Sequence, residues 1–215
     1  MTIVFENNDF IIADKPHGLP TVPLKNKNED TLLSQVAAVC PDVLTVKGNN
    51  PWEGGALHRL DTATSGLVMF AKNIDFYNYM LEVQKKDGFL KRYTAQSDIT
   101  DKKTDTVVET YFRHFGPKGV MVKPVTDISK AESPRLYTTK IKSLYNTENT
   151  TVYQCVITRG FKHQIRSHMA YIGHPITGDS LYNPEYKDKK TDLLLTCTGL
   201  VFKLKNGETF TYNLQ

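Results

Sequence analysis

From Phe89 onward, the chain is a succession of short strand-like segments interrupted by one helical stretch. The strand-like segments cover residues 89–95, 106–114, 120–123, 138–143, 151–158, 193–203 and 209–212. The helical stretch runs from about Lys162 to Ile172, and Gly173 follows it. Many strands with few helices predict an α+β fold with a mixed, mainly antiparallel central sheet flanked by a few helices.

The part before Phe89 combines further strands with two helices. Short strands are expected at residues 3–5, 10–14 and 67–72. One helix follows a cap at Asp30 or Thr31 and ends at Pro41, and another follows Asn73 and is closed by Gly88. The expected apolar faces are Leu32, Val36 and Val39 in the first helix, and Phe76, Met80 and Val83 in the second.

The length and composition predict one compact domain spanning residues 1–215. Hydrophobic residues make up 40% and charged residues 23%, which excludes a disordered tail, a collagen-like repeat and a coiled coil. No apolar stretch approaches the roughly 20 residues that span a bilayer, and no lipidation motif indicates membrane attachment. The first ten residues contain no base, so we expect no secretory signal.

The three cysteines indicate the compartment. Cys40, Cys155 and Cys197 are isolated and form no C-x-x-C pair. They provide neither a disulfide framework nor a thiolate zinc site. A reduced, cytoplasmic protein is therefore expected.

Charge is unevenly distributed along the chain. Residues 1–84 hold 6 bases and 10 acids, a net charge of −4, whereas residues 85–215 hold 21 bases and 13 acids, a net charge of +8. A basic region of this kind suits a polyanionic partner. A lysine-rich solvated surface explains the same excess equally well.

One loop carries a dense set of reactive side chains. The run from His58 to Gly66 reads His-Arg-Leu-Asp-Thr-Ala-Thr-Ser-Gly and directly precedes an apolar strand. Loops held by rigid strands often carry catalytic groups, so Asp61 is a candidate for a carboxylate fixed in a cleft. An aspartate that caps a turn is the alternative, and from this loop alone it is the more frequent case.

Two further segments carry candidate site residues. In the helical stretch, positions 163 and 166 share a face, so His163 and Arg166 are expected to approach the same ligand or carboxylate. His168 is five positions beyond His163, which is poor geometry for one metal ion, and no metal site is expected. The strand segment Lys91-Arg92-Tyr93 suits a platform for a base and its phosphate, although an edge strand with a half-buried Tyr93 fits the same residues.

Together these segments resemble the RluA-type pseudouridine synthases, which isomerise uridine in ribosomal or transfer RNA. Five motifs occur in the family's order: Asp14-Lys15-Pro16-His17-Gly18-Leu19, His58-Arg59-Leu60-Asp61 with Thr64-Ser65-Gly66, Lys91-Arg92-Tyr93-Thr94-Ala95, His163-Gln164-Ile165-Arg166-Ser167-His168 with Gly173-His174-Pro175-Ile176-Thr177-Gly178-Asp179, and Leu195 with Leu200 and Phe202. The small N-terminal RNA-binding module of many relatives is expected to be absent, because the Lys-Pro motif begins near residue 15.

The resemblance implies a role for each matched residue. Asp61 corresponds to the nucleophile or base, Tyr93 to the active-site tyrosine and Arg166 to the basic partner of the aspartate. Arg59 corresponds to the residue that fills the gap left by a flipped base, and Leu195 to an apolar residue under that base. His58 and His163 are expected to contact the substrate. The reaction is redox-neutral, so neither a metal nor an organic cofactor is expected, and the expected protein is a monomer that binds an RNA stem-loop.

Two positions depart from the family pattern. Gly160-Phe161-Lys162 stands where the family has Gly-Arg-Thr, and Leu195-Thr196-Cys197 stands where it has Leu-His-Ala. These changes concern substrate contacts near the helix start and leave the matched aspartate, tyrosine and arginine intact.

Two other functions fit parts of the same sequence. A noncatalytic RNA-binding protein with this fold would bind RNA without forming product. A hydrolase using His58, Asp61 and Ser65 lacks the Gly-x-Ser-x-Gly elbow, although spacing alone does not exclude a triad.

Overall fold

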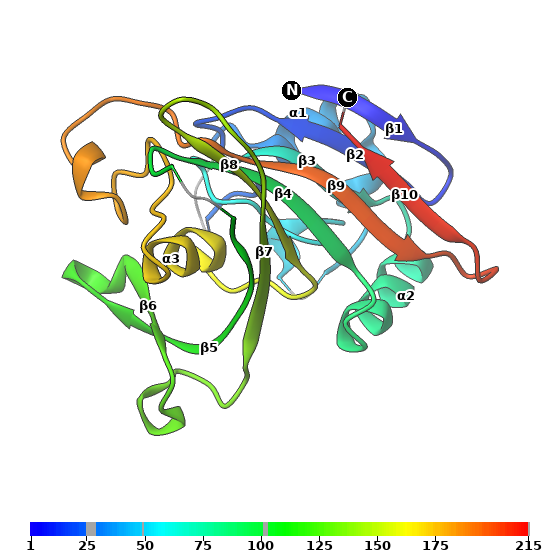
Figure 1. Ribbon diagram of the computed structural model, residues 1–215. Helices are drawn as coiled ribbons and strands as arrows, with labels where there is room; N and C mark the ends of the chain where they lie inside the picture. Colours follow the sequence, from blue (N-terminus) through cyan, green and yellow to red (C-terminus); the bar gives the residue numbers. More distant parts are fainter. Residues whose placement is uncertain (25–28, 49, 101–102, 215) are drawn as a thin grey trace. The chain divides into compact units, whose positions relative to one another are not determined.

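The computed structural model describes residues 1–24, 29–48, 50–100 and 103–214. The chain forms two compact units. Unit 1 combines Met1–Phe89 with Thr196–Gln215, and unit 2 consists of Leu90–Leu195. The two ends of the chain therefore meet in unit 1, whereas unit 2 is continuous in sequence (Figure 1).

The strands of unit 1 form a mixed sheet. They are β1 (Thr2–Glu6), β2 (Phe10–Lys15), β3 (Ser65–Ala71), β9 (Leu195–Lys203, whose first residue belongs to unit 2) and β10 (Thr209–Asn213). They pair in the order β1-β2-β3-β9-β10, and every pair is antiparallel except β3 with β9. The parallel pair joins segments from opposite ends of the sequence.

Helix α1 (Leu32–Val39) follows the expected capping signal. The Thr31 hydroxyl accepts the Ser34 N–H, and the Ser34 hydroxyl accepts the Thr31 N–H, which makes a reciprocal capping box. The face of α1 differs from the expected one at its last residue, since Val39 is 64% exposed. Short 3₁₀ turns follow at Pro41–Leu44 and Pro51–Glu53.

Helix α2 (Ile74–Lys85) packs on the aromatic core of unit 1. The Asn73 side chain caps it by accepting the Phe76 N–H. The Phe76 ring stacks on Phe10 with 4.9 Å between centroids, and Phe202 from β9 meets both rings edge-on. Residues from the beginning, middle and end of the sequence therefore share this core.

Unit 2 is an entirely antiparallel sheet. Its strands are β4 (Leu90–Ser97), β5 (Asp105–Phe115), β6 (Met121–Val125), β7 (Tyr137–Asn146) and β8 (Thr151–Ile157). They pair in the order β4-β8-β7-β5-β6. Short 3₁₀ turns lie at Pro117–Gly119, Ile128–Lys130 and Pro184–Tyr186.

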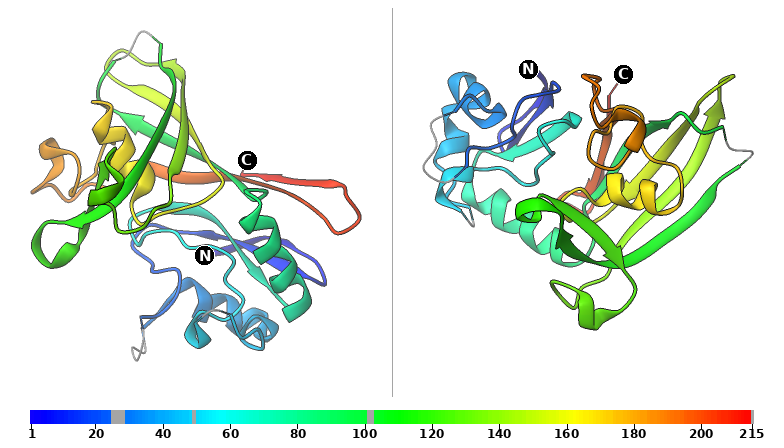
Figure 2. Two further views of the ribbon diagram at one scale, coloured as in Figure 1. Left: turned by 90° about the horizontal axis from the view of Figure 1, so that it is seen from below. Right: turned by 90° about the vertical axis from the view of Figure 1, so that its left-hand side faces the viewer.

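Helix α3 (Gln164–Tyr171) lies against β6 and β7, inside the curve of these strands (Figure 2). On its inner side, Phe112 stacks between Phe161 and His168, with 4.9 Å between centroids in both pairs. Phe161 is one of the departures from the family pattern, and its half-buried ring extends the aromatic cluster of unit 2.

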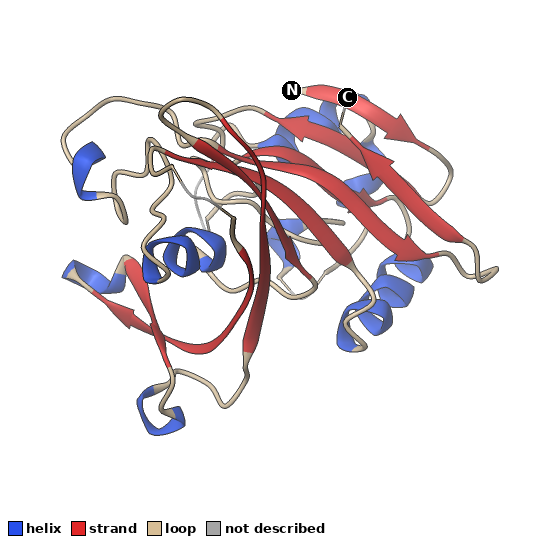
Figure 3. Ribbon diagram, viewed as in Figure 1, coloured by secondary structure: helices blue, strands red, loops and turns tan. Residues whose placement is uncertain are grey.

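Strands predominate over helices in both units (Figure 3). The prediction of an α+β fold with a mixed, mainly antiparallel sheet is confirmed. Across the described ranges, we find no helix with the length and apolar character needed to cross a membrane. A single domain spanning 1–215, with a cleft across its sheet, stays a prediction.

Candidate active site

The loop that carries Asp61 is anchored on both sides. Before Asp61, the Leu60 N–H donates to Thr21 Oγ1 at 3.1 Å, and the same hydroxyl donates to the Leu60 carbonyl at 2.8 Å. After it, the Thr64 N–H donates to the Asp61 carbonyl at 2.9 Å. Backbone groups thus close the turn that begins at Asp61.

Lys15 provides a buried cation beside this loop. Its side chain is fully buried, and its ammonium donates to the carbonyls of Pro16, Leu19 and Thr62 at 2.9, 2.8 and 3.2 Å. Burial lowers the pKa of Lys15 to about 8, while the negative charges of Asp61 and then Asp14 act in the opposite direction. In the sequence, Lys15 is recognisable only as part of the motif Asp14–Leu19. Its contact with the Asp61 loop was not predicted.

Gly66, where the loop enters β3, lies very close to β9. Its φ is +105°, and a Cβ atom on Gly66 would lie 2.3 Å from the Cys197 carbonyl oxygen. The adjacent pair is linked by its side chains, because Ser65 Oγ and Thr196 Oγ1 are 2.8 Å apart. The departure Thr196-Cys197 therefore fits the close approach of β3 and β9.

His58 and Arg59 have different environments. His58 is partly buried, its Nε2 accepts the Met69 N–H at 3.3 Å, and its ring meets Phe89 edge-on at 5.4 Å. The Arg59 side chain is 62% exposed and pairs with Glu53 at 2.6 Å. The Glu53 carboxylate is more buried, at 15% exposure, so only the Arg59 side of this pair is open to solvent.

The geometry argues against the hydrolase alternative. A serine nucleophile needs a hydrogen bond to its general base. The Ser65 hydroxyl instead bonds to Thr196, and His58 Nε2 accepts a backbone N–H.

In unit 2, the strand β4 buries alternate residues. Tyr93 is 5% exposed and pairs with Cys155 on β8. Lys91 points to the same face, is 4% exposed and donates to the Thr158 carbonyl at 2.8 Å. The Lys91 ammonium is therefore engaged by the fold, which argues against a direct contact with phosphate. Leu195 is also buried, at 3% exposure.

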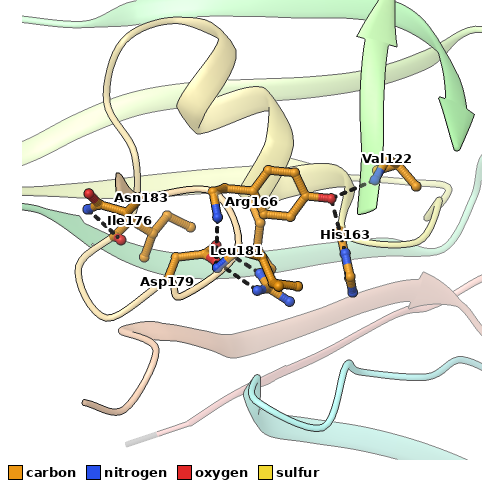
Figure 4. A network of polar contacts seen from close by, with 8 residues as sticks. Val122, His163, Arg166, Ile176, Asp179, Leu181 and Asn183 are labelled. Atoms are coloured by element: carbon orange, nitrogen blue, oxygen red, sulfur yellow. Dashed lines mark hydrogen bonds and ion pairs between the residues drawn. The ribbon is translucent and has the colours of Figure 1, made fainter. Parts of the chain in front are cut away.

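Arg166 forms a bidentate ion pair with Asp179. Its Nε donates to Asp179 Oδ2 at 2.8 Å and its Nη2 donates to Oδ1 at 2.7 Å, with both side chains buried (Figure 4). Such fork-like pairs combine strength with a fixed orientation. Asp179 is the last residue of the motif Gly173–Asp179, but the sequence did not predict its pairing with Arg166.

His163 differs from the expected geometry. It was predicted inside the helix, but α3 begins at Gln164 and His163 is the preceding cap residue with a left-handed backbone, φ 54° and ψ 21°. Its Nδ1 lies 3.1 Å from the Tyr182 hydroxyl. His163 and Arg166 thus flank the same tyrosine, since the Arg166 Cζ lies 5.4 Å from the centre of the Tyr182 ring.

His168 is a core residue. Its Nε2 and Nδ1 lie 2.9 and 2.8 Å from the hydroxyls of Thr110 and Thr139, and burial lowers its pKa to about 4. Within the described part of the chain, no three His, Cys, Asp or Glu side chains gather in a way that would hold a metal ion.

The candidate residues are divided between the two units. Unit 1 holds His58, Arg59 and Asp61, and unit 2 holds Tyr93, His163, Arg166 and Leu195. The structure brings together His163 and Arg166 around Tyr182 in unit 2, and Asp61 and Lys15 in unit 1. The pairing of Asp61 with Arg166 stays a prediction.

Comparisons with known proteins all lead to the same family. A family profile described as RNA pseudouridylate synthase matches residues 9–171. The dual-specificity RNA pseudouridine synthase RluA of Vibrio cholerae is 31% identical over 185 residues, which cover 85% of this chain and 68% of that protein. An uncharacterized RNA pseudouridine synthase of Bacillus subtilis, YlyB, is 28% identical over 184 residues, covering 86% of this chain and 58% of that protein.

Other relatives are longer than the matching region. The ribosomal large subunit pseudouridine synthase D of Haemophilus ducreyi is 29% identical over 182 residues, or 85% of this chain, and the chain spans only 52% of that protein. Among solved structures, human RNA pseudouridylate synthase domain containing 1 is similar in fold, with a TM-score of 0.76 at 19% identity. That similarity covers 100% of this chain and 82% of the human one.

Proposed function

Because the chain belongs to the RNA pseudouridylate synthase family, we propose that it is an isomerase that converts uridine in RNA to pseudouridine. The observation that carries this proposal is the anchored loop of Asp61, which holds a carboxylate beside the buried ammonium of Lys15. A carboxylate fixed in position is what the reaction requires.

The proposed chemistry needs few groups. The bond between the sugar and the base nitrogen breaks, the base turns, and carbon 5 of the ring joins the sugar. In the proposal, Asp61 is the nucleophile or base, Tyr93 stacks on the base and takes part in removing the carbon-5 proton, and Arg166 supplies positive charge near Asp61. The reaction is redox-neutral and in this proposal uses no metal or cofactor.

The remaining site residues are proposed to bind the substrate. A uridine must leave its stack to be reached, which costs a few kcal/mol. Arg59 is exposed and is proposed to fill the gap that the flipped base leaves, while Leu195 forms an apolar floor under the base. His58 and His163 are proposed to contact the same nucleotide.

Substrate and setting follow from the same proposal. The relatives include proteins named for the large ribosomal subunit and one named as dual-specificity, so we propose a stem-loop of ribosomal or transfer RNA as the target. We propose that residues 1–215 act as a single catalytic domain, as a monomer in the cytoplasm.

The test is pseudouridine formation in RNA taken from a strain that lacks the protein. We expect the purified wild type to form pseudouridine at defined positions. Asp61→Asn should lower the single-turnover rate by roughly 10⁴-fold or more, because it removes the nucleophile with almost no change in shape. The control is Asp75→Asn, at an exposed position of α2 in the same unit.

Two results would contradict the proposal. RNA binding by the wild type without product on any RNA would favour a noncatalytic binding protein. Rapid turnover by Asp61→Asn would remove Asp61 from the mechanism.

A further inference from the structure

The segment that follows the Gly178 turn wraps around the Asp179 carboxylate. Asp179 Oδ1 accepts the N–H groups of Leu181 and Tyr182 at 3.0 and 3.1 Å, besides its bonds to Arg166 (Figure 4). The Asn183 side chain ties the same segment to the Ile176 carbonyl at 3.1 Å. The backbone of Tyr182 is therefore held by the carboxylate that holds Arg166.

The side chain of Tyr182 contacts both candidate site residues on the α3 side. The Arg166 guanidinium lies over its ring at 5.4 Å, and the His163 ring meets its edge at 5.7 Å with an interplanar angle of 84°. The Tyr182 hydroxyl accepts the Val122 N–H at 2.8 Å and lies 3.1 Å from His163 Nδ1. One aromatic residue thus contacts the guanidinium by its face and the imidazole by its hydroxyl.

The two hydrogen bonds of the Tyr182 hydroxyl differ in which atom donates. A phenol oxygen that already accepts the Val122 N–H directs its own proton toward another acceptor. Nδ1 of His163 lies at hydrogen-bonding distance and serves as that acceptor when the ring proton is on Nε2. A Tyr182 hydroxyl that donates to Nδ1 would favour the His163 tautomer protonated at Nε2.

The backbone of His163 is also unusual. A left-handed conformation is unfavourable for a residue other than glycine, and such strain concentrates at functional sites. His163 does not use its side chain to cap α3, because its Nδ1 is directed to Tyr182.

We propose that Tyr182 is a positioning residue of the active site, which supports the face of the Arg166 guanidinium that Asp179 orients and holds His163 in the tautomer protonated at Nε2. This inference rests on the proposed function for its effect on catalysis. Its effect on the tautomer can be measured without any RNA.

The test compares Tyr182→Phe, Tyr182→Leu and the control Tyr186→Phe. Tyr186 lies in the same segment, and its hydroxyl also makes a hydrogen bond, to Asp98 at 2.6 Å, away from His163 and Arg166. Nitrogen-15 NMR of the imidazole rings reports the tautomer, and the spectrum of His163→Asn assigns the His163 signals among the six histidines.

We expect wild type and Tyr186→Phe to show His163 protonated at Nε2, and Tyr182→Phe to show a mixture of tautomers. In single turnover at saturating RNA, Tyr182→Phe should be about 10-fold slower, because it loses the hydrogen bonds to His163 and Val122 but keeps the ring. Tyr182→Leu should be about 100-fold slower, because the guanidinium also loses its support. The RNA affinity of both variants should remain within about twofold of wild type, since Tyr182 acts through its neighbours.

An unchanged His163 tautomer in a folded Tyr182→Phe would overturn the proposal, as would a wild-type rate in that variant. Failure of Tyr182→Leu to fold leaves the decision with Tyr182→Phe, which keeps the ring. A wild type without isomerase activity contradicts the proposed function, and the NMR comparison then still decides whether Tyr182 sets the tautomer.

Discussion

Lys15 and Arg166 are both buried cations, but they are stabilised by different partners. Lys15 donates to three backbone carbonyls, so its charge is held by dipoles and by nearby carboxylates. Arg166 instead pairs with the carboxylate of Asp179 through two hydrogen bonds. The two cations therefore respond differently to substitution: loss of Lys15 leaves carbonyls unsatisfied, whereas loss of Arg166 leaves a buried charge.

This difference leads to a prediction for Arg166. Arg166→Met should destabilise the protein by about 3–5 kcal/mol, because it leaves Asp179 buried without its partner. The double variant Arg166→Met with Asp179→Asn should recover much of that stability, because the uncompensated charge is gone. Chemical unfolding measures both values, and pseudouridine assays on the two variants measure activity.

The two measurements separate folding from catalysis. If Arg166 supplies charge for the reaction, the double variant remains inactive although it is folded. Wild-type activity in the double variant would assign Arg166 to the fold alone.

His168 predicts a loss of stability in acid. Burial lowers its pKa to about 4, from an ordinary value of 6.5, so the unfolded state binds a proton that the folded state does not. The stability of the fold with a neutral His168 is fully present above pH 6.5, and it is lost as the pH falls from 6.5 toward 4. By pH 4.5 the loss should be about 2–3 kcal/mol.

The measurement is the free energy of unfolding of wild type and His168→Gln at pH 7 and pH 4.5. The variant has no group titrating at this position, so it should lose less stability than wild type over this interval. The control is His114→Gln, because His114 is exposed beside Glu132 and should leave the acid loss nearly intact. Equal acid loss in wild type and His168→Gln would rule out His168 as the source.

At the scale of elements, local signals predicted the helices better than their faces. Thr31 and Asn73 cap α1 and α2 as their side-chain chemistry predicts. Val39 was expected on the buried face of α1 but is exposed, because the apolar positions used are Leu32, Leu33 and Val36. Periodicity indicates which residues share a side of a helix, but tertiary packing decides how far the buried side extends.

The motifs named candidate site residues one by one but did not predict the contacts among them. The motifs identified Asp61, Tyr93 and Arg166, whereas the contacts of Lys15 and Asp179 depend on loops that return from elsewhere in the chain. The left-handed backbone of His163 was not predicted, because histidine adopts it more often than most residues but far less often than glycine. Lys91 was misjudged because the strand alternation that buries Tyr93 also buries Lys91.

The contact between β3 and β9 gives a prediction at this scale. Gly66→Ala should destabilise unit 1 by about 3 kcal/mol or more, because its Cβ would collide with the Cys197 carbonyl and its φ is positive. Gly207→Ala is the matched control, because Gly207 also has a positive φ, of +88°, but no atom lies within 4 Å of the added carbon.

Thermal unfolding of the two variants separates the two costs. The control should lose only about 1 kcal/mol, the cost of the left-handed conformation itself. Similar losses in both variants would show that β9 moves to accommodate the methyl group.

For the whole molecule, the basic excess predicts salt-dependent RNA binding. A stem-loop that uses roughly 4–6 phosphate contacts gives a slope of log K against log salt of about −3 to −5. Lys86→Ala, at an exposed position, should reduce this slope by about 1. Lys91→Ala should leave the slope unchanged and lower stability instead, because its ammonium is bound to the Thr158 carbonyl.

Binding titrations over a series of salt concentrations give these slopes. A flat response in the wild type would show that the net charge of +8 over residues 85–215 is only a solvated surface. A reduced slope in a folded Lys91→Ala would show that Lys91 reaches RNA after all.

The division of unit 1 into two distant segments affects how the protein is made. At about 5–20 residues per second, roughly 5–20 s separate the emergence of Phe89 from that of Thr196 on the ribosome. During this interval Phe10 and Phe76 are already synthesised, but Phe202, which completes their cluster, is not. Unit 2 is continuous in sequence and can fold during this interval. The order of synthesis therefore favours folding of unit 2 before unit 1. The incomplete unit 1 is then the part of the nascent chain that most needs protection by chaperones.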